Sequence, residues 1–151
     1  MRISNYIDYL QHSEEQLAKA FKAVAKHHVP EPDVHEMCQL FASWSLDHAE
    51  NLTAMLSRYG NEEENEPDRL NYSLLKMRTG SLGLLRDLHD LWLMANEVIL
   101  GWVILQQCSK ALRDDKLKLC CVQFSSQTRR QAEWLMMKIK HSAPQALTVP
   151  I

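Results

Sequence analysis

Glycine and proline are scarce in this sequence, with four glycines and five prolines in 151 residues. The sequence also lacks stretches in which β-branched or aromatic residues alternate with polar ones, the pattern that predicts half-buried strands. Leucine, alanine, glutamate, lysine, glutamine and methionine, which favour helices, are frequent instead. These features exclude a β-rich fold and predict an all-α protein. A chain of this length is long enough to bury one core as a single domain.

The sequence has no marked excess of one charge and no long apolar run. It contains 17 basic and 19 acidic residues, for a net charge of −2, so no basic surface for nucleic acid or anionic lipid is predicted. No uninterrupted run of about 18 apolar residues is present. The amino terminus lacks the charged-then-apolar order of a signal peptide. We therefore expect a soluble, cytoplasmic protein with no nucleic-acid partner and no membrane partner.

The four cysteines do not form a recognisable framework. They are Cys38, Cys108, Cys120 and Cys121, and the only close pair is adjacent. This spacing fits neither a zinc site nor a set of disulfides. We interpret them as reduced thiols within the core.

Apolar residues recur at helical spacing along most of the chain and predict four long helices. The predicted ranges are 4–28, 33–59, 81–112 and a last helix that ends near residue 141. The second helix has Pro32 near its first turn and Gly60 just beyond its end, which are favoured start and stop residues.

The connections between these helices differ in length. An acidic segment at 61–67 is interpreted as a solvated crossover, and a weaker helical stretch follows at 68–78. Residues 113–115 form a short turn into the last helix. We therefore predict a bundle over residues 1–141 and a carboxy-terminal tail over 142–151 that lies outside the core.

Polar residues interrupt the apolar stripes of three helices near their midpoints. The stripes are broken by Glu14 on the first helix, by Ser45 and His48 on the second, and by Thr128 and Gln131 on the fourth, while the third carries the small Ala95. The Cβ atom of Glu14 projects along the same face as Leu10 and Leu17. We therefore predict a central polar layer inside the bundle.

This layout resembles the ferritin-like superfamily, which includes rubrerythrin and bacterioferritin. In that family two helices each supply one Glu and the other two each supply Glu-x-x-His, and together they hold a di-iron or di-manganese centre. The resemblance places these six positions at Glu14, at Ser45 with His48, at Ala95, and at Thr128 with Gln131. Glu14 and Ser45 are 31 residues apart, and Ala95 and Thr128 are 33 apart, so the chain reads as two similar halves. The resemblance implies a four-helix bundle with a long crossover between the second and third long helices.

Only Glu14 and His48 retain a ligand of the family at these positions. Because a di-metal centre depends on several carboxylates, we expect no cofactor. Glu14 and His48 are instead predicted to form a charge-assisted hydrogen bond, with Ser45, Thr128 and Gln131 satisfying the remaining polar atoms. The function expected from this pattern is binding or assembly with a protein partner, and not enzymatic redox catalysis.

An alternative interpretation keeps the chemistry of the family. In it, Glu14 and His48 are metal ligands, and the chain is a ferritin-like oxidoreductase or metal sensor that uses iron or manganese. The sequence offers no Ser/His/Asp arrangement and no paired acids that would favour a hydrolase instead.

The third long helix is apolar nearly all round. Leu93, Leu100 and Ile104 lie opposite its core stripe, so a second buried face is predicted. We expect this face to form a homodimer, because exposed apolar patches mark contacts. The competing explanation is that the helical stretch at 68–78 folds over it.

Other conspicuous residues have simpler interpretations. The four tryptophans are interpreted as packing residues: Trp44, Trp92, Trp102 and Trp134. The histidines near the first loop, which are His27, His28 and His35, are interpreted as surface residues. The arginine pair on the last helix, Arg129 and Arg130, is interpreted as part of a solvated face.

Overall fold

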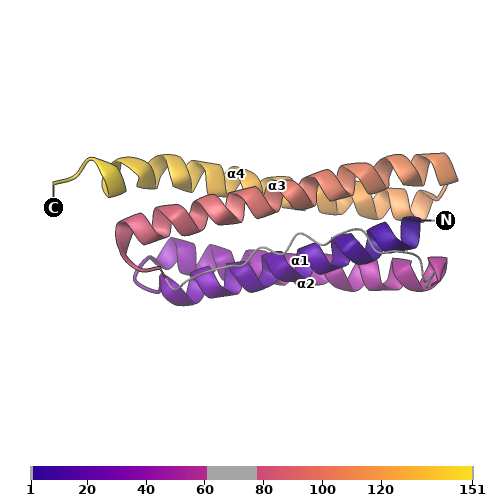
Figure 1. The fold of residues 1–151 in the computed structure, drawn as a ribbon, viewed down its shortest axis with the longest axis horizontal. Coiled ribbons are helices and arrows are strands. Elements are labelled where there is room, and N and C mark those ends of the chain that lie inside the picture. Colours follow the sequence, from indigo (N-terminus) through magenta and orange to yellow (C-terminus); the bar gives the residue numbers. More distant parts are fainter. Residues whose placement is uncertain (1, 61–77, 151) are drawn as a thin grey trace.

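The computed structural model describes residues 2–60 and 78–150, which form four long helices (Figure 1). They are α1 (Ile3–His27), α2 (Pro32–Tyr59), α3 (Gly80–Leu112) and α4 (Asp115–Leu147). No strand occurs within these two ranges. The predicted all-α fold and the four-helix architecture are confirmed.

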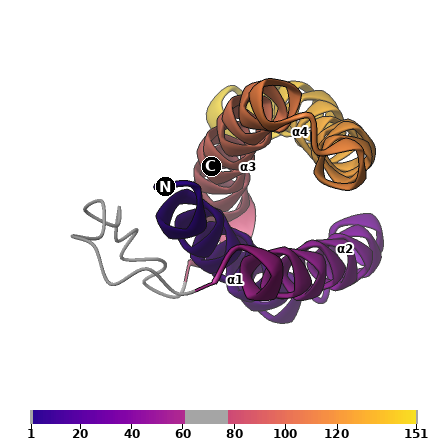
Figure 2. The same ribbon diagram turned by 90° about the vertical axis from the view of Figure 1, so that its right-hand side faces the viewer.

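The helices form two antiparallel hairpins, α1 with α2 and α3 with α4 (Figure 1). The hairpins meet mainly through α1 and α3, whereas α2 and α4 contact each other less extensively (Figure 2). α2 ends and α3 begins at opposite ends of the bundle, as a long crossover requires. This architecture is compatible with a ferritin-like bundle. The predicted acidic crossover and the weaker helical stretch lie at 61–78, of which all but Arg78 falls outside the described residues.

The helix ends follow the local signals in the sequence. Pro32 is the first residue of α2, where its missing amide costs nothing, and Gly60 ends the helix with a positive φ of 76°. The Asp114 side chain caps α4 by accepting a hydrogen bond from the Leu117 amide at 3.1 Å. These interactions explain why the predicted starts and stops agree closely with the observed helices at these points.

The predicted end of the last helix is wrong. α4 continues past His141 to Leu147 and includes Pro144, and Ser142 is buried, so the predicted tail begins too early. Pro144 lies in the final turn, and its carbonyl oxygen accepts a hydrogen bond from the Thr148 amide at 3.0 Å.

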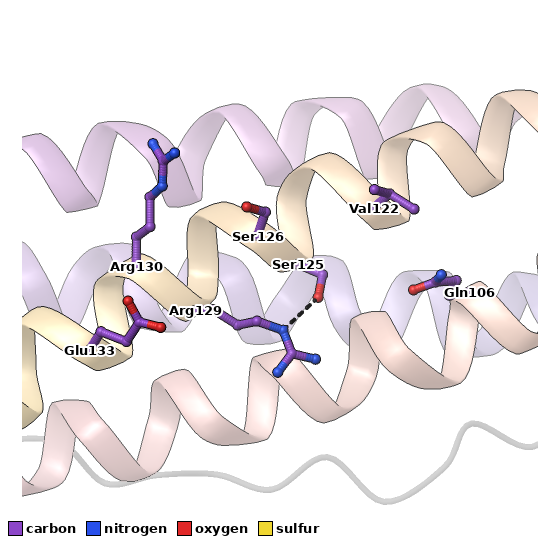
Figure 3. Close-up of a pocket in the computed structure, with 7 residues that line it drawn as sticks. All are labelled: Gln106, Val122, Ser125, Ser126, Arg129, Arg130 and Glu133. Carbon is purple, nitrogen blue, oxygen red and sulfur yellow. Dashed lines mark hydrogen bonds between the residues drawn. The ribbon is translucent and has the colours of Figure 1, made fainter.

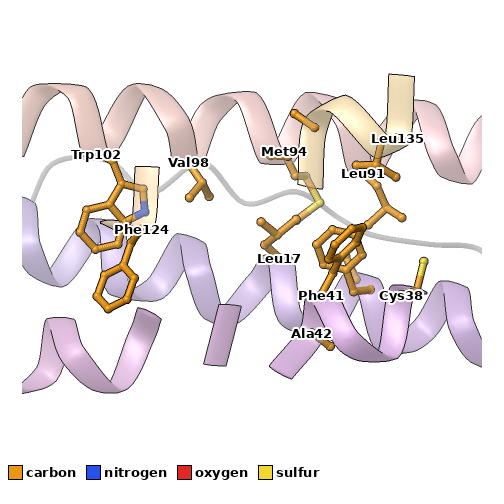
Figure 4. Close-up of a cluster of buried hydrophobic side chains, with 14 of the residues drawn as sticks. Leu17, Cys38, Phe41, Ala42, Leu91, Met94, Val98, Trp102, Phe124 and Leu135 are labelled. Atoms are coloured by element: carbon orange, nitrogen blue, oxygen red, sulfur yellow. The ribbon is translucent and has the colours of Figure 1, made fainter. Parts of the chain in front are cut away.

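The four apolar stripes meet in one continuous core (Figure 4). Leu17, Phe41 and Leu91 pack at one level, and Trp102 packs against Phe124 at another, with ring centroids 5.5 Å apart. Trp102 is fully buried, and the other three tryptophans pack on the edge of this core. The packing role predicted for the tryptophans therefore agrees with the structure.

Gly101 sets the closest approach between the two hairpins. A Cβ atom added at Gly101 of α3 would lie 2.5 Å from Cδ1 of Leu10 on α1. Since Leu10 is itself fully buried, no larger residue fits here without displacing it. Glycine at this position thus permits the tight α1–α3 contact.

By length and composition alone, α3 is apolar enough to cross a membrane. Within the bundle, however, one of its faces supplies much of the core, and Asp87 is buried on that face. Core helices pass the same compositional test, so the apolar character of α3 does not distinguish the two environments.

The four cysteines differ in burial. Cys38 and Cys121 are buried, and burial raises the pKa of each thiol to about 12. Cys108 and Cys120 are only partly buried, so the prediction of core thiols holds for two of the four. All four are free.

Polar contacts join the two hairpins at several heights. The Tyr9 hydroxyl donates to the Glu97 carboxylate at 2.6 Å, and Nζ of Lys138 lies 2.6 Å from Oδ2 of Asp33. At the far end of α2, the Tyr59 hydroxyl donates to the carboxylate of Asp114. Together these contacts fix the register between the hairpins.

Candidate functional site

A chain of three polar side chains, two of them fully buried, crosses the middle of the bundle. Nδ1 of His48 on α2 forms a hydrogen bond with Oε2 of Glu14 on α1, and both side chains are 0% exposed. Nε2 of the same ring lies 2.6 Å from Oε1 of Gln127 on α4. His48 thus connects three of the four helices.

The partners of His48 determine where its protons lie. A carboxylate and an amide oxygen are both acceptors, so the Nε2 proton is donated to Gln127. On the other side, one proton is shared between Nδ1 of His48 and Oε2 of Glu14. The pair therefore consists either of an imidazolium and a carboxylate or of two neutral groups, and in both cases it retains this proton.

The surroundings raise the pKa of both members of the pair. Burial raises the pKa of the Glu14 carboxyl, and the hydrogen bond and charge of His48 offset this only in part. Burial opposes the charged form of His48, but the hydrogen bond and charge of Glu14, assisted by Gln127, raise its pKa overall. Both shifts favour the protonated forms in the folded protein.

Trp102 completes the wall beside this pair. Its ring meets the His48 ring edge-on, with centroids 6.1 Å apart and an interplanar angle of 89°. Its indole N–H is close enough to favour the ionised form of Glu14, although no hydrogen bond of ordinary geometry joins the two. Among the described residues, Nε1 of Trp102 and Oε1 of Glu14 are both buried without a hydrogen-bond partner.

The other members of the predicted polar layer form a separate group one turn away. Nε2 of Gln131 donates to the Ser45 hydroxyl at 3.1 Å and to the Phe41 carbonyl at 3.0 Å. The Thr128 hydroxyl donates to the Phe124 carbonyl within its own helix at 2.8 Å. All three polar side chains are 0% exposed.

The expected partners of the Glu14–His48 pair are therefore wrong in part. The other polar residues, Ser45, Thr128 and Gln131, form hydrogen bonds among themselves or to the backbone. The hydrogen bond to Nε2 of His48 is made by Gln127 instead. Gln127 precedes Thr128 and lies beside the core stripe, so its position on the helix gave no signal that it would reach across to α2.

The six positions suggested by the ferritin-like resemblance all lie inside the bundle. Each is 0% exposed, and they are Glu14, Ser45, His48, Ala95, Thr128 and Gln131. Their chemistry does not fit a di-metal centre, because Ala95 has no donor atom and only one of the six is a carboxylate. Within residues 2–60 and 78–150, no group of three or more His, Cys, Asp or Glu side chains could hold a metal ion.

His48 is also poorly prepared to bind a metal. A histidine ligates through a nitrogen that carries no proton, whereas both ring nitrogens of His48 are hydrogen-bonded to acceptor side chains. Metal binding would require the loss of Glu14 or Gln127 as its partner.

A second buried pair lies near one end of the bundle and was missed by sequence reasoning. Nε2 of His28, at the end of α1, lies 2.7 Å from Oδ2 of Asp87 on α3. Asp87 is 0% exposed, and Arg78 lies 3.6 Å from its other oxygen. Burial raises the pKa of Asp87, while His28 and Arg78 offset part of this effect.

The prediction that His28 is a surface residue is wrong, since it is 3% exposed. The chain reverses direction directly after His28, which turns the ring toward the first turns of α3. A signal was available in the sequence, because Asp87 lies between Leu84 and Leu91 on the core stripe of α3. A carboxylate at such a position requires a buried partner.

Comparisons of this chain with models of known protein families, with curated proteins and with solved structures found no match.

Proposed function

We propose that this chain is a ferritin-like bundle that acts through binding or assembly and carries out no redox catalysis at a di-metal centre. The observation that best supports this proposal is the state of His48, whose two ring nitrogens are both engaged by Glu14 and Gln127. Of the six buried positions that would hold metal ligands, Glu14 bonds to His48 and Gln131 bonds to Ser45. Such a layer contributes a fixed register between helices, a role that buried polar groups have in some bundles.

The outer face of α3 is the proposed assembly surface. Leu93 is 42% exposed and Leu100 is 58% exposed, and they are two helical turns apart on the same side, with Ile104 beyond them. In a two-fold dimer the same patch meets itself. The midpoint between Leu93 and Leu100 falls between residues 96 and 97. If two antiparallel copies of α3 met with the two-fold axis at this point, Leu93 of one copy would lie against Leu100 of the other.

The test of this proposal is the mass of the protein in solution. At micromolar concentration, sedimentation equilibrium is expected to give a dimer, and a Leu93→Glu, Leu100→Glu double variant is expected to give a monomer. The variant brings like charges together in the interface, which costs several kcal/mol in such contacts. Its far-ultraviolet circular dichroism should remain that of the wild type.

Leu119→Glu is the matched control, because Leu119 is 70% exposed on α4 and lies outside the proposed surface. This variant should sediment as the wild type does. A monomeric wild type, or a double variant that remains dimeric, would contradict the proposed assembly surface.

A second candidate function is a metal sensor or oxidoreductase that uses Glu14 and His48 with iron or manganese. One observation favours it, which is that Oε1 of Glu14 is buried without a hydrogen-bond partner among the described residues. A ligand that binds only the folded state stabilises it, by about 2.7 kcal/mol at a hundredfold excess over Kd. The melting temperature rises accordingly.

Calorimetry of the metal-stripped wild type, with and without added Fe²⁺, Mn²⁺ or Zn²⁺, distinguishes the two functions. We expect no metal-dependent rise in Tm, since the donor atoms of His48 are already engaged. A rise in the wild type that disappears in both Glu14→Gln and His48→Gln would favour the metal-binding function over the first proposal.

A further inference from the structure

The outer side of the α3–α4 hairpin contains a hollow of about 410 Å³ (Figure 3). It is formed mostly by α4. The lining consists of one residue from α3 and six from α4: Gln106, Val122, Ser125, Ser126, Arg129, Arg130 and Glu133. Its volume lies toward the lower end of the range for small-molecule sites, which is about 300–1,000 Å³.

The lining is rich in hydrogen-bond donors. The residues that line this hollow carry two guanidinium groups, two hydroxyls and one carboxamide, against a single carboxylate, that of Glu133. In a chain with a net charge of −2, this is a local excess of positive charge. Within the part of the chain that the structure describes, neither Arg129 nor Arg130 forms an ion pair. Both guanidinium groups therefore remain available to an anion.

Arg129 is exposed and makes a hydrogen bond within its own helix. Its Nε donates to the hydroxyl of Ser125, one turn earlier on α4, at 3.4 Å, and Ser125 is itself buried. Figure 3 shows the guanidinium group of Arg129 turned toward α3, on the same side as Gln106, while Arg130 extends from α4 in a different direction. This hydrogen bond uses Nε only, so the terminal nitrogens of Arg129 can make a bidentate contact.

We propose that this hollow binds the phosphate group of a small molecule, with Arg129, Ser125 and Gln106 as its direct contacts. A phosphate has three terminal oxygens and more charge than a carboxylate, so it uses more of the donors gathered here. Arg130 adds favourable charge at the rim. Val122, which is half exposed at the other end of the hollow, offers an apolar wall to the organic part of the ligand.

Isothermal titration calorimetry with inorganic phosphate tests the site on the full-length chain, with sodium chloride at matched ionic strength in the reference titration. Saturable binding is expected for the wild type. Arg129→Gln should weaken binding at least about tenfold, the difference that 1.4 kcal/mol makes, because it removes both the charge and the bidentate contact. Arg130→Gln should have a smaller effect.

Arg86→Gln is the matched control, since Arg86 is an exposed arginine of α3 that does not line the hollow. It should bind phosphate as the wild type does. Absence of saturable binding in the wild type, or equal losses in Arg86→Gln and Arg129→Gln, would overturn the proposal.

The phosphate could belong to a free metabolite or to a lipid headgroup, and a second arm of the experiment separates these sources. Flotation with phosphatidylcholine vesicles that contain phosphatidic acid should leave the wild type unbound. Vesicle binding that is lost in Arg129→Gln would assign the site to a lipid headgroup. Vesicle binding that Arg129→Gln leaves unchanged, without phosphate binding in solution, would count against the site altogether.

Discussion

His48→Leu is expected to lower the free energy of unfolding by about 3–5 kcal/mol, the usual cost of breaking a buried ion pair from one side. The substitution leaves the fully buried carboxyl of Glu14 without its partner, and Gln127 loses its donor as well. Leucine fills a similar volume, so the loss would come mainly from the unsatisfied polar groups and less from a cavity. Urea denaturation monitored by circular dichroism measures this difference.

The double variant Glu14→Leu, His48→Leu is the control for this interpretation. Because it removes both partners, it should be more stable than His48→Leu alone, although it carries one more substitution. If His48→Leu costs less than about 1 kcal/mol, or if the two substitutions add, the pair is not coupled in the way the geometry indicates.

The same pair should also appear in the pH dependence of stability. The reference pKa values are 4.5 for Glu14 and 6.5 for His48, and both are raised in the folded state. The folded chain therefore binds protons more tightly, and this contribution is complete below the reference values and is lost as pH rises through the folded pKa of each group. Because the folded pair shares one proton and unfolded His48 keeps one up to its reference pKa of 6.5, the wild type should lose stability relative to the double leucine variant as pH rises above about 6.5.

Trp102→Ala is the second substitution with a large expected effect, at about 3–5 kcal/mol for the removal of a buried tryptophan. Trp102 is 0% exposed and contacts both Phe124 and the His48 ring. The space it leaves would be bounded on one side by Glu14 and His48, so water is expected to enter it. Chemical denaturation measures the loss in stability.

Trp92→Ala is the matched control, because the same substitution is made on the same helix at a residue that is only partly buried. It should cost clearly less. Equal losses in the two variants would show that burial beside the polar pair is not what makes Trp102 important. A Trp102→Phe variant should be more stable than Trp102→Ala, because phenylalanine keeps part of the contact with Phe124.

The helices and the burial of Glu14 and His48 could be predicted from the sequence because both follow from the spacing of apolar residues along each helix. A stripe that is apolar at Leu10 and Leu17 places Glu14 inside whatever the helix packs against. Helical periodicity alone identifies such a residue, and burial then requires a polar partner for it.

Contacts between helices could not be predicted in the same way. Periodicity assigns a residue to a face, but it does not give the height at which two helices meet or the reach of a side chain at the edge of the stripe. Gln127 was missed for this reason, and His28 was missed because it lies just beyond a helix end, where the chain turns. The extent of α4 was underestimated because residues 142–151 contain two prolines, which favour a helix end, whereas the helix continues through Pro144 to Leu147.

The polar contacts between the hairpins have a consequence for the order of folding. Tyr9 and Glu97 are 88 residues apart in the chain, and His48 and Gln127 are 79 apart, whereas each hairpin is held by contacts that are local in sequence. Local contacts close small loops and form first, so the hairpins should form early and dock late. A docking error of one helical turn, about 5.4 Å, would bring none of these partners together. It would also separate Asp87 from His28 and Nε2 of His48 from Gln127. A slipped intermediate should therefore separate and dock again before it can persist.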